Sequence, residues 1–108
     1  MSISYYGVPV RDAKRVGPIV EGTDTATVID EAKVRAAFGK RFKGGAKGTL
    51  KWEAGGDYVF IDVLPTHVLV THNAGRGSYQ IEVVIDAIGT LRELGLFVWD
   101  PQQGSWVS

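Results

Sequence analysis

The chain contains no cysteine, and this absence removes several classes of function. Without a thiol there can be no disulfide scaffold, thiolate nucleophile, iron–sulfur cluster or cysteine-ligated zinc. Histidine is almost as scarce, since His67 and His72 are the only two. Their odd spacing points them to opposite faces of a shared strand, so they cannot chelate one ion. We therefore expect no metal site and no cofactor.

Long apolar runs and catalytic motifs are missing as well. No hydrophobic stretch approaches the roughly 20 residues that span a bilayer, and the first ten residues lack the features of a secretory signal. The expected location is therefore cytoplasmic, with no membrane partner. No nucleophile elbow or P-loop pattern occurs, and the pair Glu82 and Asp86 fits a solvated helix face better than an acid–base pair. We expect no catalytic residues and no enzyme.

The composition is that of an ordinary globular domain. With 108 residues, 44% of them hydrophobic and 22% charged, residues 1–108 should form a single domain with one core. The net charge is zero but unevenly spread, because residues 33–51 hold seven of the 12 basic residues and no acid. This stretch is interpreted either as a solvated helix end and loop or as an anion-binding surface.

Turn residues and hydrophobic periodicity divide the chain into eight elements. Residues 11–24 are expected to be irregular, because Gly17-Pro18 and Gly22 punctuate them. The first strand contains Pro9 near its end, which favours a place near a sheet edge. The predicted strands are residues 3–10, 49–53, 57–64, 67–73, 96–99 and 105–107, and the predicted helices are 27–38 and a second one from Ser78 to just before Gly95.

Both helices carry recognisable end signals and apolar stripes. Thr27 and Asp30 resemble a capping box for the first helix, and Gly39 stands where a C-terminal glycine is expected. The second helix has Ser78 as a reasonable N-cap. Its predicted core stripe is Ile81, Val84, Ile85, Ile88, Leu91 and Leu94, and the residues expected to turn away are Gln80, Glu82, Asp86 and Glu93.

The order β-α-β-β-β-α-β-β predicts an α+β fold. Strands outnumber helices and neighbouring strands are mostly joined by hairpins, so we expect two layers, a largely antiparallel sheet of five or six strands with two helices on one face. If Pro65-Thr66 forms a tight turn, Asp62 faces Leu69 and Phe60 faces Thr71. That register sorts the hairpin into an aliphatic core face and a face of mixed character.

The mixed face carries the candidate partner-binding residues. Tyr58, Phe60 and Leu69 lie on it, and Trp52 on the preceding strand is added as a further apolar anchor. Three interpretations stay open: the rings are covered by the N-terminal segment or a loop, they stack on RNA bases, or they form a protein interface, where aromatic residues are enriched.

A glycine-arginine loop is the most suggestive local motif. Gly75-Arg76-Gly77-Ser78 follows a strand and opens a helix, so its backbone N–H groups could hold an anion, although a plain strand-to-helix turn explains it equally. It lacks the third glycine of a dinucleotide fingerprint. The alternative function, nucleic-acid or anionic-ligand binding, would use Lys40, Arg41, Lys43, Lys47, Arg76 and Ser78.

Residues 94–104, LGLFVWDPQQG, resemble the ending of small bacterial immunity proteins of polymorphic toxin systems and their uncharacterised relatives. In those proteins a helix and a Leu-Gly-Leu sequence lead into a strand and an Asp-Pro-Gln turn. The likeness covers 11 of 108 residues and implies a bacterial origin and a stoichiometric inhibitor, with no catalytic residues to carry over. The leading hypothesis is thus a small non-enzymatic protein that acts by binding another protein.

Overall fold

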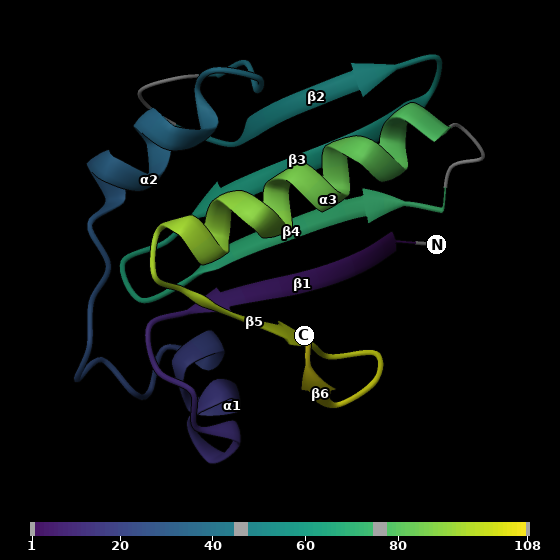
Figure 1. The fold of residues 1–108 in the computed structure, drawn as a ribbon. Helices are drawn as coiled ribbons and strands as arrows, with labels where there is room; N and C mark the ends of the chain where they lie inside the picture. The colour runs from purple at the N-terminus through teal and green to yellow at the C-terminus, as the bar shows by residue number, and fades with distance from the viewer. Residues whose placement is uncertain (1, 45–47, 75–77, 108) are drawn as a thin grey trace.

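The computed structural model describes residues 2–44, 48–74 and 78–107. It shows an α+β fold with one antiparallel sheet (Figure 1). In chain order the elements are β1 Ser2–Val8, α1 Ala13–Glu21, α2 Glu31–Phe38, β2 Leu50–Ala54, β3 Asp57–Val63, β4 Val68–Asn73, α3 Ser78–Glu93, β5 Phe97–Asp100 and β6 Ser105–Trp106. The α+β class and the antiparallel sheet are confirmed, but the described chain has three helices where two were predicted.

The six strands of the sheet follow the order β2-β3-β4-β1-β5-β6. β1 therefore lies inside the sheet, and the prediction that it runs near an edge is wrong. Gly7 pairs with Val68 of β4 on one side and with Val98 of β5 on the other. Pro9 follows the last residue of β1, so its missing N–H costs no ladder hydrogen bond.

The β3–β4 hairpin has the register that the sequence predicts. Asp62 pairs with Leu69, and Phe60 pairs with Thr71. At the turn, the Leu64 N–H donates to the His67 carbonyl at 2.9 Å. Side chains alternate across these strands, so the aliphatic and mixed faces separate as expected.

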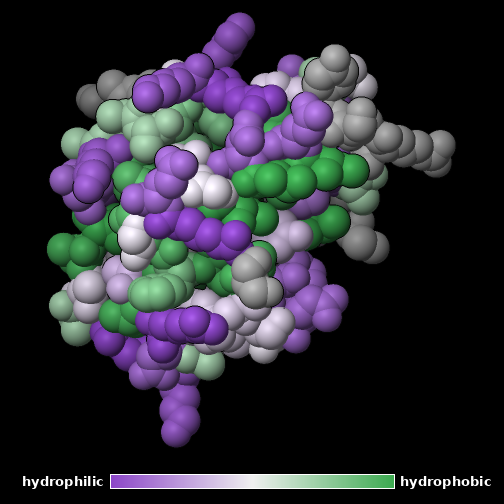
Figure 2. Space-filling model, viewed as in Figure 1, coloured by the Kyte–Doolittle hydropathy of each residue, from purple (hydrophilic) through white to green (hydrophobic). Residues whose placement is uncertain are grey.

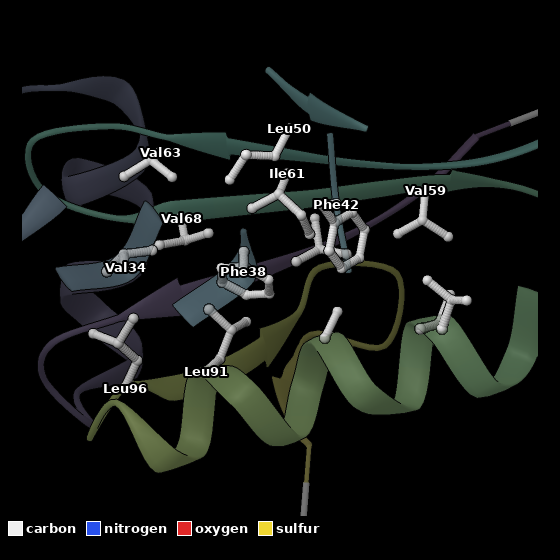
Figure 3. Close-up of a cluster of buried hydrophobic side chains, with 14 of the residues drawn as sticks. Val34, Phe38, Phe42, Leu50, Val59, Ile61, Val63, Val68, Leu91 and Leu96 are labelled. Carbon is white, nitrogen blue, oxygen red and sulfur yellow. The ribbon is translucent and has the colours of Figure 1, made fainter. Parts of the chain in front are cut away.

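One face of the sheet packs against α2 and α3. Figure 3 shows Phe38 and Leu91 in the layer between α3 and the sheet, with Ile61 and Val68 on the sheet side. All four side chains are buried. Burying a side chain of this size contributes about 1.5–3 kcal/mol, so this layer is the main source of stability.

The predicted core stripe of α3 is only partly correct. Val84 and Leu91 are buried, but Ile81 and Ile85 are 58% and 61% exposed. Gln80, which was expected to turn away, is buried. The buried face of α3 is centred near Ala87 and Leu91 and is rotated from the predicted stripe, so Ile81 and Ile85 lie outside it. Hydrophobic surface is therefore exposed beside polar side chains on this side of the molecule (Figure 2).

Helix α1 occupies the region predicted to be irregular. Asp12 caps its first turn by accepting a hydrogen bond from the Lys14 N–H at 3.1 Å, and Gly22 ends it with a left-handed φ of 84°. Val16 and Ile19 are buried against Val8 of β1. Val8 alternates with Gly7, which faces α3, so α1 packs on the opposite side of the sheet from α2 and α3. The two-helix, single-face layering is thus incorrect.

Helix α2 begins four residues later than predicted. Asp30 is its N-cap and accepts from the Lys33 N–H at 3.1 Å, so the proposed box headed by Thr27 does not form. Val28, which lies in the predicted helix 27–38 but before the start of α2, is 67% exposed. The Ile29 N–H instead donates to the Pro65 carbonyl at 2.9 Å, which ties this extended segment to the β3–β4 turn.

The turn after β5 fastens the C-terminal hairpin to β1. Asp100 Oδ1 accepts from the Gln102 N–H at 2.9 Å. The Gln102 amide then bonds both backbone groups of Ser4, at 3.0 Å from the Ser4 N–H and 2.9 Å to its carbonyl. The side chain in this way continues the β-ladder beyond the end of β5.

Candidate functional site

The face of the sheet opposite α2 and α3 is uncovered over β2, β3 and β4 in the part of the chain that the structure describes. Helix α1 packs on this side in a cluster with Val8 at the end of β1, and it also meets the β3–β4 turn, where the Thr66 hydroxyl donates to the Ile19 carbonyl at 3.3 Å. We call the uncovered region the open face. The strand registers place these residues on one side: Lys51, Glu53, Tyr58, Phe60, Asp62, Leu69 and Thr71.

Two aromatic rings form the centre of the open face. Tyr58 and Phe60 stack with ring centroids 4.4 Å apart and an interplanar angle of 27°. Lys51, the cross-strand partner of Phe60, holds its Nζ 5.8 Å from the Phe60 ring centroid. Both rings are half-buried, and they border a shallow hollow of about 260 Å³ beside the β2–β3 turn. They form a fixed, accessible apolar patch.

A network under the start of β3 fixes the position of Tyr58. The Tyr58 N–H donates to Asn73 Oδ1 at 3.0 Å, and Gln80 Nε2 donates to the Tyr58 carbonyl at 3.1 Å. Gln80 also bonds the Asn73 side chain. Sequence reasoning missed both residues. For Gln80, the sequence does contain a signal: it lies three residues before Val83, a spacing that places both side chains on the same, buried side of α3.

The structure brings three of the four predicted anchors together. Tyr58, Phe60 and Leu69 share the open face, and Leu69 is half-buried there. Trp52 pairs with Val59, so it points to the other side of the sheet and packs against the main core. It therefore does not belong to this surface.

Two carboxylates near the candidate surfaces have partners within the chain. Asp62 accepts a hydrogen bond from the Thr49 hydroxyl. The pair Glu82 and Asp86 lies on exposed α3, where Asp86 pairs with Arg41. These contacts give Asp62 and Asp86 partners within the chain, and an apolar patch beside a hydrogen-bonded carboxylate is suited to recognising a surface.

Some of the predicted anion-binding residues converge near the β2 edge. Arg41, Lys43 and Lys51 border a hollow of about 520 Å³ together with Trp52 and Glu53. Lys43 and Lys51 exchange backbone hydrogen bonds of 2.8 and 2.7 Å across that edge.

The other anion-binding candidates are not part of this cluster. Lys40 borders a separate groove between α2 and α3. Lys47 and Arg76 lie outside the described residues, as does the side chain of Ser78, the first residue of α3. Of these candidates, the structure brings Arg41 and Lys43 together.

The two histidines lie on opposite faces, as predicted. His67 meets Tyr6 edge-on at a centroid distance of 6.2 Å, and His72 stacks on Tyr5 at 5.9 Å on the helix-covered side. Burial lowers the pKa of His67 below its ordinary value. Across residues 2–44, 48–74 and 78–107, no three histidine, aspartate or glutamate side chains gather in a metal-binding group.

None of the protein-family models, curated proteins or solved structures compared with this chain matches it. Among the helices of the described residues, none has the length and hydropathy needed to cross a membrane.

Proposed function

We propose that the chain is a non-enzymatic protein that acts by binding another protein through the open face. The observation that carries this proposal is the stack of Tyr58 on Phe60 on a sheet surface that no described helix covers. The resemblance of residues 94–104 to immunity proteins favours a stoichiometric inhibitor as the kind of binder.

The physical support is pre-organisation. Aromatic side chains dominate the energetics of protein interfaces, and fixing them before binding lowers the entropy that association costs. The Tyr58 backbone is held by Asn73 and Gln80, and the Phe60 ring lies between Tyr58 and Lys51. Leu69 extends the patch across to β4. A partner would therefore meet a ready-made apolar centre.

The test compares two single substitutions on opposite sides of the sheet. A partner captured by the wild-type protein is purified, and its affinity is measured for Phe60→Ser and for Ile85→Ser. Ile85 is a matched control because it is apolar, 61% exposed and located on α3, on the other side of the molecule.

Phe60→Ser is expected to weaken binding by about thirtyfold or more, as loss of an interface hot spot of 2 kcal/mol does. Ile85→Ser is expected to leave affinity unchanged. Full affinity of the Phe60 variant, with loss in the Ile85 variant, would place the interface on α3 and overturn the proposal.

The hollow near β2 supports a second candidate, binding of a nucleic acid. Arg41, Lys43 and Lys51 border it together with Trp52 and Glu53, and an aromatic residue beside basic side chains is a combination that proteins use to hold single strands. Titration with single-stranded RNA at two salt concentrations tests it. Each phosphate contact should add about −0.7 to the slope of log affinity against log salt. Absence of binding at low salt contradicts this candidate.

A further inference from the structure

Two lysines lie directly opposite each other at the β2 edge of the sheet. β2 is an outermost strand (Figure 1), and beyond it Lys43 pairs with Lys51 in an isolated antiparallel bridge. The two residues exchange both backbone hydrogen bonds, so their side chains point to the same face of the sheet. Lys51 is also the cross-strand partner of Phe60, which places both lysines on the side of the open face. We call Lys43 and Lys51 the lysine pair.

The lysine pair has no carboxylate partner within the chain. Every aspartate and glutamate of the chain lies in the part that the structure describes, and none of them forms an ion pair with Lys43 or Lys51. The third cation at this edge, Arg41, does have a partner, Asp86 of α3. Like charges directly opposite each other on paired strands are unfavourable. The chain therefore keeps two positive charges side by side without neutralising them.

The lysine pair borders the aromatic patch of the open face. Lys43, Lys51 and Phe60 follow one another in a row across the strands, and the Lys51 Nζ lies 5.8 Å from the Phe60 ring centroid. A protein that covers the stacked rings of Tyr58 and Phe60 must bring its surface close to both ammonium groups. Such contact removes water from the two charges, which is costly unless a group of opposite charge replaces it.

We propose that the protein bound by the open face presents an aspartate or glutamate side chain to the lysine pair, beside the apolar groups that contact Tyr58 and Phe60. This inference rests on the proposed protein-binding function and adds the charge of the partner's surface. A carboxylate between two ammonium groups accepts charge-assisted hydrogen bonds from both and offsets their mutual repulsion.

The other charges of the open face favour a single carboxylate over a nucleic acid. Glu53 is exposed two residues after Lys51 on the same side of β2, and Asp62 lies on that side of β3. A nucleic-acid strand carries a negative charge at every nucleotide and would pass over these two acids as well. One acidic side chain of a protein can reach the lysine pair without meeting them.

The first test compares two charge reversals against a partner captured by the wild-type protein. Lys43→Glu changes the lysine pair, and Lys40→Glu makes the same change at an exposed residue that borders the groove between α2 and α3. Lys43→Glu is expected to weaken binding by about tenfold or more, mainly through slower association, and the effect should diminish as salt is added. Lys40→Glu should change affinity by less than about threefold.

The outcome separates this inference from the proposed function. If Phe60→Ser weakens binding but Lys43→Glu has no larger effect than Lys40→Glu, the acidic group is wrong and the protein-binding function stands. If Phe60→Ser binds as tightly as wild type, both are overturned.

The second test needs no partner. Lys43→Glu places opposite charges across the bridge to Lys51, so it should raise the folding equilibrium constant by about twofold to fivefold in denaturant unfolding, and Lys40→Glu should not. A variant that is more stable yet binds less well is expected when like charges are kept together for a partner. A Lys43→Glu variant no more stable than wild type would show that the two lysines do not oppose each other, which overturns the inference.

Carbodiimide crosslinking of the complex identifies the group that meets the lysine pair, because it joins an amine directly to a carboxylate. Mass spectrometry should show Lys43 or Lys51 linked to an aspartate or glutamate of the partner. Links to the partner from other lysines only, or from none, contradict the assignment.

Discussion

Gly7 of β1 lies directly beneath Leu91 of α3: a β-carbon at position 7 would stand 2.9 Å from Leu91 Cδ2 and 3.1 Å from Cδ1. Leu91 is fully buried in the main core. The absence of a side chain at position 7 is therefore what lets the C-terminal half of α3 approach the middle of the sheet.

Gly7→Ala should destabilise the protein by about 1–3 kcal/mol, because a well-packed core does not admit an extra methyl group without shifts. Chemical denaturation measures this. Part of the loss should be recovered when Leu91→Val is added, and the double-mutant cycle should show coupling of about 1 kcal/mol. Gly89→Ala is the control, since a β-carbon there meets nothing within 4 Å and should stabilise the helix by about 0.5–1 kcal/mol. A Gly7→Ala variant as stable as wild type contradicts this packing.

His67 should make stability depend on pH. It is buried, and desolvation lowers its pKa in the folded state. The unfolded chain therefore takes up a proton near pH 6.5 while the folded chain does not. The contribution of His67 to the free energy of unfolding is complete above about pH 6.5. It falls as the pH drops below that value, by up to about 1.4 kcal/mol per pH unit.

The comparison is the free energy of unfolding of wild type and His67→Gln at pH 7.5 and 5.5. The difference in the free energy of unfolding between wild type and the variant should be smaller at pH 5.5 than at pH 7.5. The titration of the carboxylates is common to both proteins and cancels in this difference. A histidine titration that gives His67 a pKa at or above that of a free histidine would show the sign to be wrong.

Ile19 should be the residue that holds α1 on the sheet. Its side chain is 1% exposed within the small cluster around Val8. Ile19→Ala is expected to cost about 2–4 kcal/mol through lost burial and a cavity, whereas Val28→Ala, at a position 67% exposed, should change stability by less than about 0.5 kcal/mol. Denaturant unfolding distinguishes them. Similar small effects at both positions would mean that α1 does not dock as described.

Gln80 should link α3 to the open face. Gln80→Leu removes the donor to the Tyr58 carbonyl and to Asn73, at a cost of about 1–3 kcal/mol for the groups left unpaired. Glu82→Gln, on the exposed side of the same helix, should be close to neutral. Amide hydrogen exchange at residues 57–60 should accelerate in the Gln80→Leu variant only. Unchanged exchange at these residues would contradict the claim that Gln80 holds the backbone of the open face in place.

Local patterns in the sequence predicted the hairpin well and the long-range arrangement poorly. The Pro65-Thr66 turn and the period-two alternation around it determine the register of β3 and β4, because both act over a few residues. The central place of β1 depends on pairing with Val68 and Val98, far along the chain, and no local signal reports that.

Helix α1 shows that glycine and proline do not always mark a break in secondary structure. Gly17-Pro18 indicates a break, yet Pro18 lies inside a nine-residue helix. Burial of Val16 and Ile19 against β1 outweighs the lost hydrogen bond, and that burial cannot be seen without the sheet.

The candidate site was predictable in the same uneven way. Alternation on β3 placed Tyr58 and Phe60 on one side, and the hairpin register added Leu69. Trp52 was misassigned, because its side of the sheet depends on the pairing with Val59.

The most direct test of the open-face proposal is site-specific photo-crosslinking in the source organism. A benzophenone amino acid replaces Phe60 in one protein and Ile85 in another, so that one probe lies on the open face and the other on α3. We expect a crosslinked adduct of one defined mass from position 60 and none from position 85. Adducts from position 85 alone, or from neither position, would contradict the claim that this protein works by binding a partner on the open side of its sheet.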